Sequence, residues 1–139
     1  MTPLNERNRS IIEEFRANGG KVGGSWTGKT LLLVHTIGKK SGVERVNPVA
    51  TFRDGDRWVI IASKGGAPAH PDWYRNLVAH PTVTVEVGTE KFQARAKVTQ
   101  EPERTRLYDR MVSINPGFAD YRARTTRAIP VVVLERIKG

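Results

Sequence analysis

Two consecutive segments with strict alternation of apolar and polar residues constrain this chain most. Residues 82–87 read TVTVEV, and after Gly88-Thr89 residues 91–98 read KFQARAKV. A period of two places one face of a strand on a core and the other in water, as in antiparallel hairpins. The apolar face is expected to carry Val83, Val85 and Val87 from the first strand and Phe92, Ala94, Ala96 and Val98 from the second. The chain therefore has to build an antiparallel sheet.

Four further segments have the composition of strands. They are residues 31–36, 45–53, 57–63 and the apolar stretch IPVVVLERI, residues 129–137. Asp54-Gly55 between two of them is a strong hairpin signal. Helices are expected at residues 5–18, 70–79, 101–114 and about 116–125, the third from the spacing of Leu107, Met111 and Ile114. The pattern predicts a mainly β, α+β fold: a small antiparallel barrel with short helices over its openings.

Length and composition limit the possible classes of protein. A chain of 139 residues suits one domain, 1–139, that opens with a helix and a connector over residues 1–22. The absence of cysteine excludes disulfides and thiolate metal sites, and with no signal-peptide core at the start a cytoplasmic location is the expectation. The net charge of +9 fits nucleic acid, an anionic membrane surface, a polyanionic small molecule or plain solubility.

The stretch GGSWTGKT, residues 23–30, matches the G-x-x-x-x-G-K-[ST] pattern of phosphate-binding loops. Such a loop functions because a strand leads into it and a helix leaves it, so that the helix N-terminus faces the phosphates. Here a helical segment comes first and the apolar run Leu31–Val34 follows. The stretch is therefore interpreted as a glycine-rich connector that matches the pattern by chance. We expect no ATPase activity, and cofactor affinity unchanged within a few-fold in Lys29→Ala.

A basic loop is the first candidate site. Between two expected strands, Gly38 and Gly42 enclose Lys39, Lys40 and Ser41, and Arg45 begins the next strand. Two ammonium groups, a hydroxyl and a planar guanidinium suit phosphate or carboxylate groups. A solvated basic hairpin is the alternative. Pro48 within the next strand indicates an edge or a bulge that a flat ligand could approach.

Two more stretches could line a pocket. In ASKGGAP the residues Ala62, Ser63 and Lys64 precede Gly65-Gly66, which would let backbone N–H groups come close to a ligand. In HPDWYRNL, Trp73 and Asn76 lie three residues apart and so share one helical face. An aromatic ring beside an amide suits a flat ring with polar edges. A flexible loop and an ordinary core position, respectively, are the alternatives.

The chain shows no evident catalytic machinery of its own. His35, His70 and His80 are scattered without carboxylates at ligand spacing, so no metal site is expected. There is neither a nucleophile elbow nor a Cys-His pair. A bound redox cofactor would explain why the chain has loops suited to anions but no catalytic side chains, because the cofactor itself carries the reactivity.

The motifs GKKSGVERVNPV, DGDRWVIIASKGGAP and HPDWYRNL, together with the ending GFADYRARTTRAIPVVVLE, resemble the deazaflavin-dependent nitroreductase family of actinobacteria. The resemblance extends from about Gly23 to Glu135. It implies the split β-barrel fold of FMN-binding proteins and binding of coenzyme F420, an 8-hydroxy-5-deazaflavin with a phosphate and a poly-glutamate tail. It also implies hydride transfer from C5 of the reduced ring to a quinone, nitro or other electrophilic substrate.

The resemblance gives the candidate residues their expected roles. Lys39, Lys40, Ser41 and Arg45 would hold the phosphate and carboxylates. Pro48, Ala62, Ser63, Lys64, Gly65, Gly66, Trp73 and Asn76 would surround the ring. Ser63 and Tyr121 are the hydroxyl groups expected to assist the reaction. The substrate would lie near Tyr121 under the N-terminal helix.

The sequence also departs from the family's best-known member. That nitroreductase has several C-terminal tyrosines near its substrate, whereas Asn115 and Phe118 stand in that stretch here and only Tyr121 remains. Reduction of the same bicyclic nitroimidazole drug is thus not implied, and quinones or electrophilic alkenes stay open.

Three alternatives remain: an FMN-binding split barrel, a non-catalytic module for deazaflavin, fatty acid or haem, and a nucleic-acid-binding protein. The last would need exposed aromatics between the cations, and no such stripe is present. The oligomeric state and a peripheral membrane contact are left open.

Overall fold

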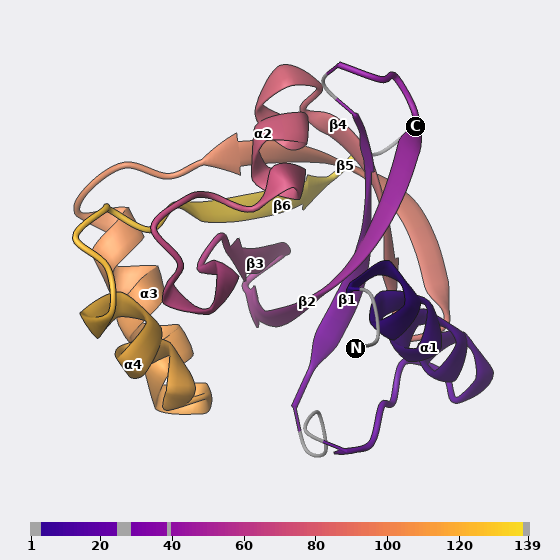
Figure 1. Ribbon diagram of the computed structural model, residues 1–139, viewed down its shortest axis with the longest axis horizontal. Helices are drawn as coiled ribbons and strands as arrows, with labels where there is room; N and C mark the ends of the chain where they lie inside the picture. Colours follow the sequence, from indigo (N-terminus) through magenta and orange to yellow (C-terminus); the bar gives the residue numbers. More distant parts are fainter. Residues whose placement is uncertain (1–3, 25–28, 39, 138–139) are drawn as a thin grey trace.

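Six antiparallel strands close into a barrel in the computed structural model, which describes residues 4–24, 29–38 and 40–137 (Figure 1). The strands are β1 (Leu31–Ile37), β2 (Glu44–Asp54), β3 (Arg57–Ile61), β4 (Thr82–Val87), β5 (Glu90–Val98) and β6 (Val131–Arg136). Their order around the barrel is β1-β2-β3-β6-β5-β4, and β4 closes the ring by pairing with β1. The predicted antiparallel barrel is confirmed.

Helices lie outside the barrel and over its ends (Figure 1). They are α1 (Leu4–Ala17), the 3-10 turn η2 (Lys64–Gly66), α2 (Asp72–Ala79), α3 (Glu103–Ile114) and α4 (Gly117–Ala123). All four predicted helices are present. The expected strand 57–63 ends at Ile61, because Ser63 takes a helical backbone conformation and begins η2. No helix of the described residues is long and apolar enough to cross a membrane.

The interior of the barrel follows the alternation in the sequence. Val83, Val85 and Ala94 are almost completely buried, together with Leu32 and Val34 of β1. Val98 was expected on the same face but is 43% exposed, because it stands at the last position of β5. Ile114, at the last position of α3, is likewise 55% exposed, although Leu107 and Met111 of the same helix are buried as predicted.

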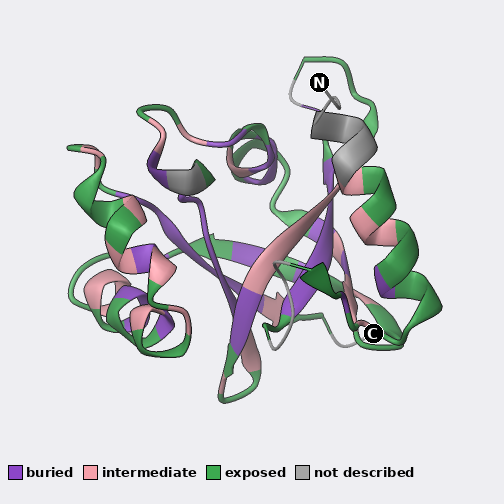
Figure 2. Cartoon of the chain, turned by 60° about the horizontal axis from the view of Figure 1, so that its bottom comes forward, coloured by how far each residue is buried: buried purple, intermediate pink, exposed green. Residues whose placement is uncertain are grey.

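Two apolar clusters cover the outer surface of the barrel. Under α1, Phe15 packs with Leu31 and Leu33 of β1, and Val46 of β2 borders this group. Under α3 and α4, Phe52 belongs to a cluster that includes Leu107, Tyr108, Met111 and Phe118. In Figure 2 many of the buried residues lie on the strands, whereas α1 is exposed along the side that faces away from them.

The two clusters leave the middle of β2 only partly buried. Alternate residues of a strand share one face, so Val46, Pro48, Ala50 and Phe52 form one row along β2. Val46 borders the α1 cluster and Phe52 belongs to the α3–α4 cluster. Pro48 lies between them and is only partly buried, and Ala50, also partly buried, packs against the edge of the α3–α4 cluster. This part of β2 forms a wall of the candidate site.

The phosphate-loop match has the reversed element order that the sequence predicted. Helix α1 precedes the stretch 23–30, and strand β1 follows it at Leu31. Residues 25–28 lie outside the described residues. Because no helix begins after Lys29, no helix N-terminus is available to a phosphate there, and the match to the nucleotide-hydrolase pattern has no structural basis.

Candidate active site

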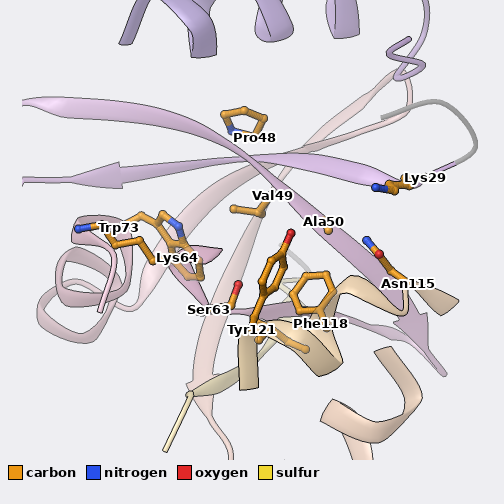
Figure 3. A pocket seen from close by; sticks show the side chains of 11 residues that line it. Lys29, Pro48, Val49, Ala50, Ser63, Lys64, Trp73, Asn115, Phe118 and Tyr121 are labelled. Carbon is orange, nitrogen blue, oxygen red and sulfur yellow. The ribbon is translucent and has the colours of Figure 1, made fainter. Parts of the chain in front are cut away.

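A cavity of about 350 Å³ opens beside β2 (Figure 3). Its lining residues come from five parts of the chain: Lys29, Pro48, Val49, Ala50, Ile61, Ser63, Lys64, Trp73, Asn115, Phe118 and Tyr121. A volume of this size is within the usual range for small-molecule sites. Five of the predicted site residues meet here, namely Pro48, Ser63, Lys64, Trp73 and Tyr121.

The loop after β3 is held by Arg127, a residue for which the sequence predicted no role. Arg127 donates from Nη2 to the carbonyl oxygens of Ser63, at 2.8 Å, and Ala62, at 3.2 Å. Its Nε donates to the carbonyl of Ala67 at 2.9 Å. One guanidinium therefore fixes both ends of the loop that carries Ser63 and Lys64 into the cavity. The only sequence signal was that Arg127 belongs to an arginine-rich segment.

The same arginine orders the segment before α2. Its Nη1 lies 2.8 Å from Nδ1 of His70, and an arginine can only donate, so this imidazole nitrogen accepts. Burial, with the nearby charges of Arg127 and Arg75, lowers the pKa of His70 below its ordinary value. The neutral imidazole is therefore the form that suits this contact.

The glycines of this loop serve a different purpose from the one expected. The N–H of Gly66 donates to the carbonyl of Ser63 at 2.9 Å, so it is occupied within the loop. Gly66 has a φ of +84°, and a Cβ on it would lie 2.8 Å from the carbonyl oxygen of Tyr121. The absence of a side chain thus lets η2 lie against α4. Ala62 is completely buried, and neither it nor Gly66 lines the cavity.

Trp73 and Asn76 share one face of α2, as predicted, but only Trp73 lines the cavity. Asn76 is buried, and its Nδ2 donates to Oγ1 of Thr36 at 3.2 Å. This bond ties α2 to the end of β1. Asn76 therefore fixes the helix that presents Trp73, and the structure does not bring it to the cavity wall.

The basic hairpin lies at the other end of β1 from Lys29. Lys39 lies outside the described residues, whereas Lys40, Ser41 and Arg45 are all exposed. The Oγ of Ser41 accepts the N–H of Val43 at 3.2 Å, which orders the turn. None of these three residues lines the cavity, so any ligand shared by the hairpin and the cavity has to extend along the barrel.

Helix α4 supplies the opposite wall. Phe118 and Tyr121 stand edge to face with ring centroids 5.1 Å apart. Tyr108 of α3 is fully buried and donates to the carbonyl of Phe118 at 2.6 Å. Burial also raises the pKa of the Tyr108 hydroxyl. This bond fixes the start of α4, so that Tyr121 directs its hydroxyl toward β2 (Figure 3).

The described lining of the cavity is basic. It contains the two ammonium groups of Lys29 and Lys64 and no carboxylate. Lys64 has a φ of +48°, which is uncommon for a residue with a side chain and is found mostly where the surrounding structure imposes it. A site with two cations and no anion favours a negatively charged ligand. Lys29 is the second lining residue without a sequence-derived role, since its segment was interpreted as a connector.

A strongly lowered pKa belongs to Glu86 of β4, outside the cavity. Glu86 accepts from Arg16 of α1 at 2.7 Å and lies 2.6 Å from Nε2 of His35. The bond from Arg16, followed by the one from His35, lowers the pKa of Glu86 to about 2. Nδ1 of His35 lies 3.2 Å from Glu44. This network attaches α1 to the barrel.

A family profile and a curated relative both match this chain over most of its length. The profile of the family described as F420H(2)-dependent quinone reductase matches residues 7–136. An F420H(2)-dependent quinone reductase of Mycobacterium tuberculosis is 40% identical over 126 residues, covering 88% of this chain and 85% of the relative.

Solved structures agree with this match. The structure of an F420-H2 dependent reductase has a TM-score of 0.70 and 36% identity, over 76% of this chain and 93% of that chain. A chain described as a domain-swapped dimer has a TM-score of 0.71 and 32% identity, over 95% and 96% of the two chains. The resemblance to deazaflavin-dependent oxidoreductases seen in the sequence is confirmed. This protein belongs to the F420H(2)-dependent quinone reductase family.

Proposed function

We propose that this protein binds reduced coenzyme F420 and uses it to reduce a quinone. The observation that carries the proposal is the cavity beside β2, which has apolar walls, a basic lining and a basic hairpin at the far end of β1. The names of the relatives support the same chemistry. When bound, the reduced coenzyme supplies a hydride from C5 of its deazaflavin ring.

The residues present fit this coenzyme. Pro48, Val49 and Ile61 offer apolar surface to a flat ring, and Trp73 offers an aromatic one. Lys64 and Ser63 lie at the same wall and suit the polar edge of the ring. Residues Lys40, Ser41 and Arg45, with Lys39, would bind the phosphate and the carboxylates of the tail, which a ligand extended along the barrel can reach. The absence of carboxylates from the described lining suits a polyanion.

The residues of the loop 62–67 have separate tasks in this proposal. Ser63 and Lys64 would contact the ring directly. Ala62, Gly65 and Gly66 would support it from behind, since Gly66 lies against α4 and Ala62 is buried. Asn76 would act through Trp73 by fixing α2 to β1.

Catalysis of this reaction depends on the positioning of the coenzyme and the quinone more than on reactive side chains. The quinone would take up the hydride that the reduced coenzyme supplies and become a hydroquinone anion, which would then take a proton from water. Tyr121 and Ser63 both line the cavity and can donate to the oxygen on which the negative charge develops. Such donors lower the barrier because they are held in place before the charge appears.

FMN is the main competing cofactor. It has one phosphate and no glutamate tail, so Lys40 and Arg45 would have fewer partners. Fluorescence titration of the purified protein with F420 and with FMN separates the two. We expect tighter binding of F420, weaker binding as the tail is shortened, and oxidation of reduced F420 by at least one quinone above a protein-free control. Equal affinity for FMN, or tight F420 binding without any turnover, would overturn the proposed function.

Two further expectations accompany this function. We propose that residues 1–139 act as one domain, because α1 packs through Phe15 on β1 and is attached to β4 through Glu86. We also propose a cytoplasmic location, where the reduced coenzyme would be available. Size-exclusion chromatography with light scattering, in the presence and absence of lipid vesicles, measures the oligomeric state and tests a peripheral membrane contact.

A further inference from the structure

We propose that Lys29 and Asn115 form an anion site for the electron acceptor, so that the protein prefers acceptors carrying an ionised oxygen, such as quinones with a ring hydroxyl. This inference rests on the proposed function. It gives a role to the lysine of the phosphate-loop pattern, which neither the connector interpretation nor the coenzyme site explains.

The position of Lys29 separates it from the coenzyme tail. Lys29 precedes β1, and the basic hairpin follows β1. A strand of seven residues spans on the order of 23 Å at ~3.3 Å per residue. One phosphate or carboxylate cannot contact both ends of such a strand. The ammonium of Lys29 is therefore available to another ligand in the cavity.

Lys29 is fixed near this position and has no competing partner among the described residues. The carbonyl of the next residue, Thr30, accepts the N–H of Thr51 at 3.0 Å, which ties the segment to β2. Within the described part of the chain no carboxylate pairs with Lys29. In Figure 3 its ammonium lies toward the same end of the cavity as Asn115, away from Trp73 and Lys64.

Asn115 presents its donors to the same space. Its Oδ1 accepts the N–H of Gly117 at 3.3 Å, and its Nδ2 is then directed into the cavity (Figure 3). The hydroxyl of Tyr121 lies nearby, because a Cβ on Gly117 would be 3.4 Å from Oδ1 of Asn115 and 3.8 Å from the Tyr121 hydroxyl. An ammonium, an amide and a hydroxyl therefore surround one end of the cavity.

These three groups complement an oxygen anion. An ammonium gives a charge-assisted bond, and the amide and the hydroxyl each add a donor. A ring hydroxyl that is ionised at neutral pH matches this set, whereas its methyl ether has the same ring and no charge. The preference for the anion is the difference between the binding free energies of the ionised quinone and its methyl ether. The affinity for the ether gives the contribution of the ring, which does not depend on charge.

The experiment compares hydroxynaphthoquinone, with its hydroxyl ionised on the quinone ring, and the corresponding methyl ether. Binding of each is measured by tryptophan fluorescence and calorimetry on the protein loaded with oxidised coenzyme, and turnover is measured with the reduced coenzyme. The variants are Lys29→Met, Lys29→Arg and Asn115→Asp. Lys21→Met is the matched control, an exposed lysine of the same connector that does not line the cavity.

We expect Lys29→Met to weaken binding of the anion about 10-fold, since a partly shielded charge-assisted bond is removed. The affinity for the ether should change about 2-fold at most. Lys29→Arg should restore the preference, because it keeps the charge. Asn115→Asp should abolish it, because a carboxylate neutralises Lys29. Lys21→Met should behave like the wild type.

Equal affinity of the wild type for anion and ether overturns the inference, as does an unchanged preference in Lys29→Met. The proposed function fails separately. If no acceptor oxidises the reduced coenzyme, but anion binding still depends on Lys29, the anion site stands and the quinone reductase assignment does not.

Discussion

The guanidinium of Arg127 donates to the backbone carbonyl of Ser63 across 2.8 Å, over a sequence separation of 64 residues. This contact connects the segment before β6 with the loop after β3. The loop carries Ser63 and Lys64 into the cavity, while Arg127 binds the backbone carbonyls of Ala62, Ser63 and Ala67. The shape of the site therefore depends on a residue that does not line it.

Replacement of Arg127 by alanine should loosen this loop. Three carbonyl oxygens lose a charged donor, which should destabilise the fold by about 2–3 kcal/mol and weaken coenzyme binding about 10-fold as the loop becomes less ordered. Hydrogen exchange at residues 62–67 and coenzyme titration measure the two effects. Arg127→Lys should rescue only partly, because a single ammonium cannot reach all the acceptors.

Arg95→Ala is the control for this experiment, since Arg95 is exposed on β5 and distant in sequence from the loop. If Arg127→Ala lowers the melting temperature but leaves exchange at residues 62–67 and coenzyme affinity unchanged, the proposed positioning role is wrong.

Gly66→Ala should be considerably more damaging than Gly55→Ala. Both glycines have positive φ, +84° and +62° respectively, so alanine is strained at either position. That strain costs about 1–2 kcal/mol. At Gly66 the added Cβ would also meet the Tyr121 carbonyl at 2.8 Å, whereas at Gly55 nothing lies within 4 Å. Chemical denaturation gives the difference, and equal losses for both variants would show that η2 and α4 are not in close contact.

The stability of the protein should fall in acid as Glu86 becomes protonated. Its pKa is lowered from 4.5 to about 2 in the folded protein. Because the folded value is below the unfolded one, the contribution is complete above about pH 4.5 and is lost as the pH falls toward 2. With an allowance for the exposed partner Arg16, the contribution is about 2 kcal/mol.

Glu86→Gln should therefore be less stable than the wild type at neutral pH and nearly equal to it near pH 2, as followed by urea unfolding across the acid range. The control is Glu90→Gln, which removes an exposed ion pair with Arg136 and should change stability by about 0.5 kcal/mol at most. A constant difference between Glu86→Gln and wild type at all pH values would contradict the assignment.

Substitutions at Tyr121 and Arg45 should affect different steps. Tyr121→Phe removes a donor in the cavity and should lower kcat/KM about 10-fold, or about 1.4 kcal/mol of barrier, with coenzyme affinity little changed. Arg45→Ala, at the exposed hairpin, should chiefly weaken coenzyme binding. Steady-state kinetics with a quinone panel, beside coenzyme titration, separates the two. A Tyr121→Phe enzyme with unaltered kcat/KM would remove Tyr121 from the reaction.

Local periodicity in the sequence was sufficient to predict the helices and strands of this fold. The alternation of residues 82–87 and 91–98 predicted β4 and β5, and Asp54-Gly55 predicted the turn between β2 and β3. Periodicity predicted burial less reliably at the ends of helices and strands. Val98 and Ile114 continue an apolar pattern, yet each is the last residue of its element and is exposed. A pattern gives the face on which a side chain lies, whereas burial requires a neighbour that covers it.

The amino-acid sequence by itself determined the strands, the hairpins, the basic hairpin loop and, through its motifs, the family. Tertiary structure alone decided that β4 pairs with β1, and that Pro48, between the two outer clusters, stays only partly buried and lines the cavity. It also decided that Arg127 reaches Ser63 and that Lys29 reaches the cavity. These relationships join residues that are far apart in the chain, whereas propensity and periodicity act over a few residues. Only the closing of the barrel brings the distant groups together.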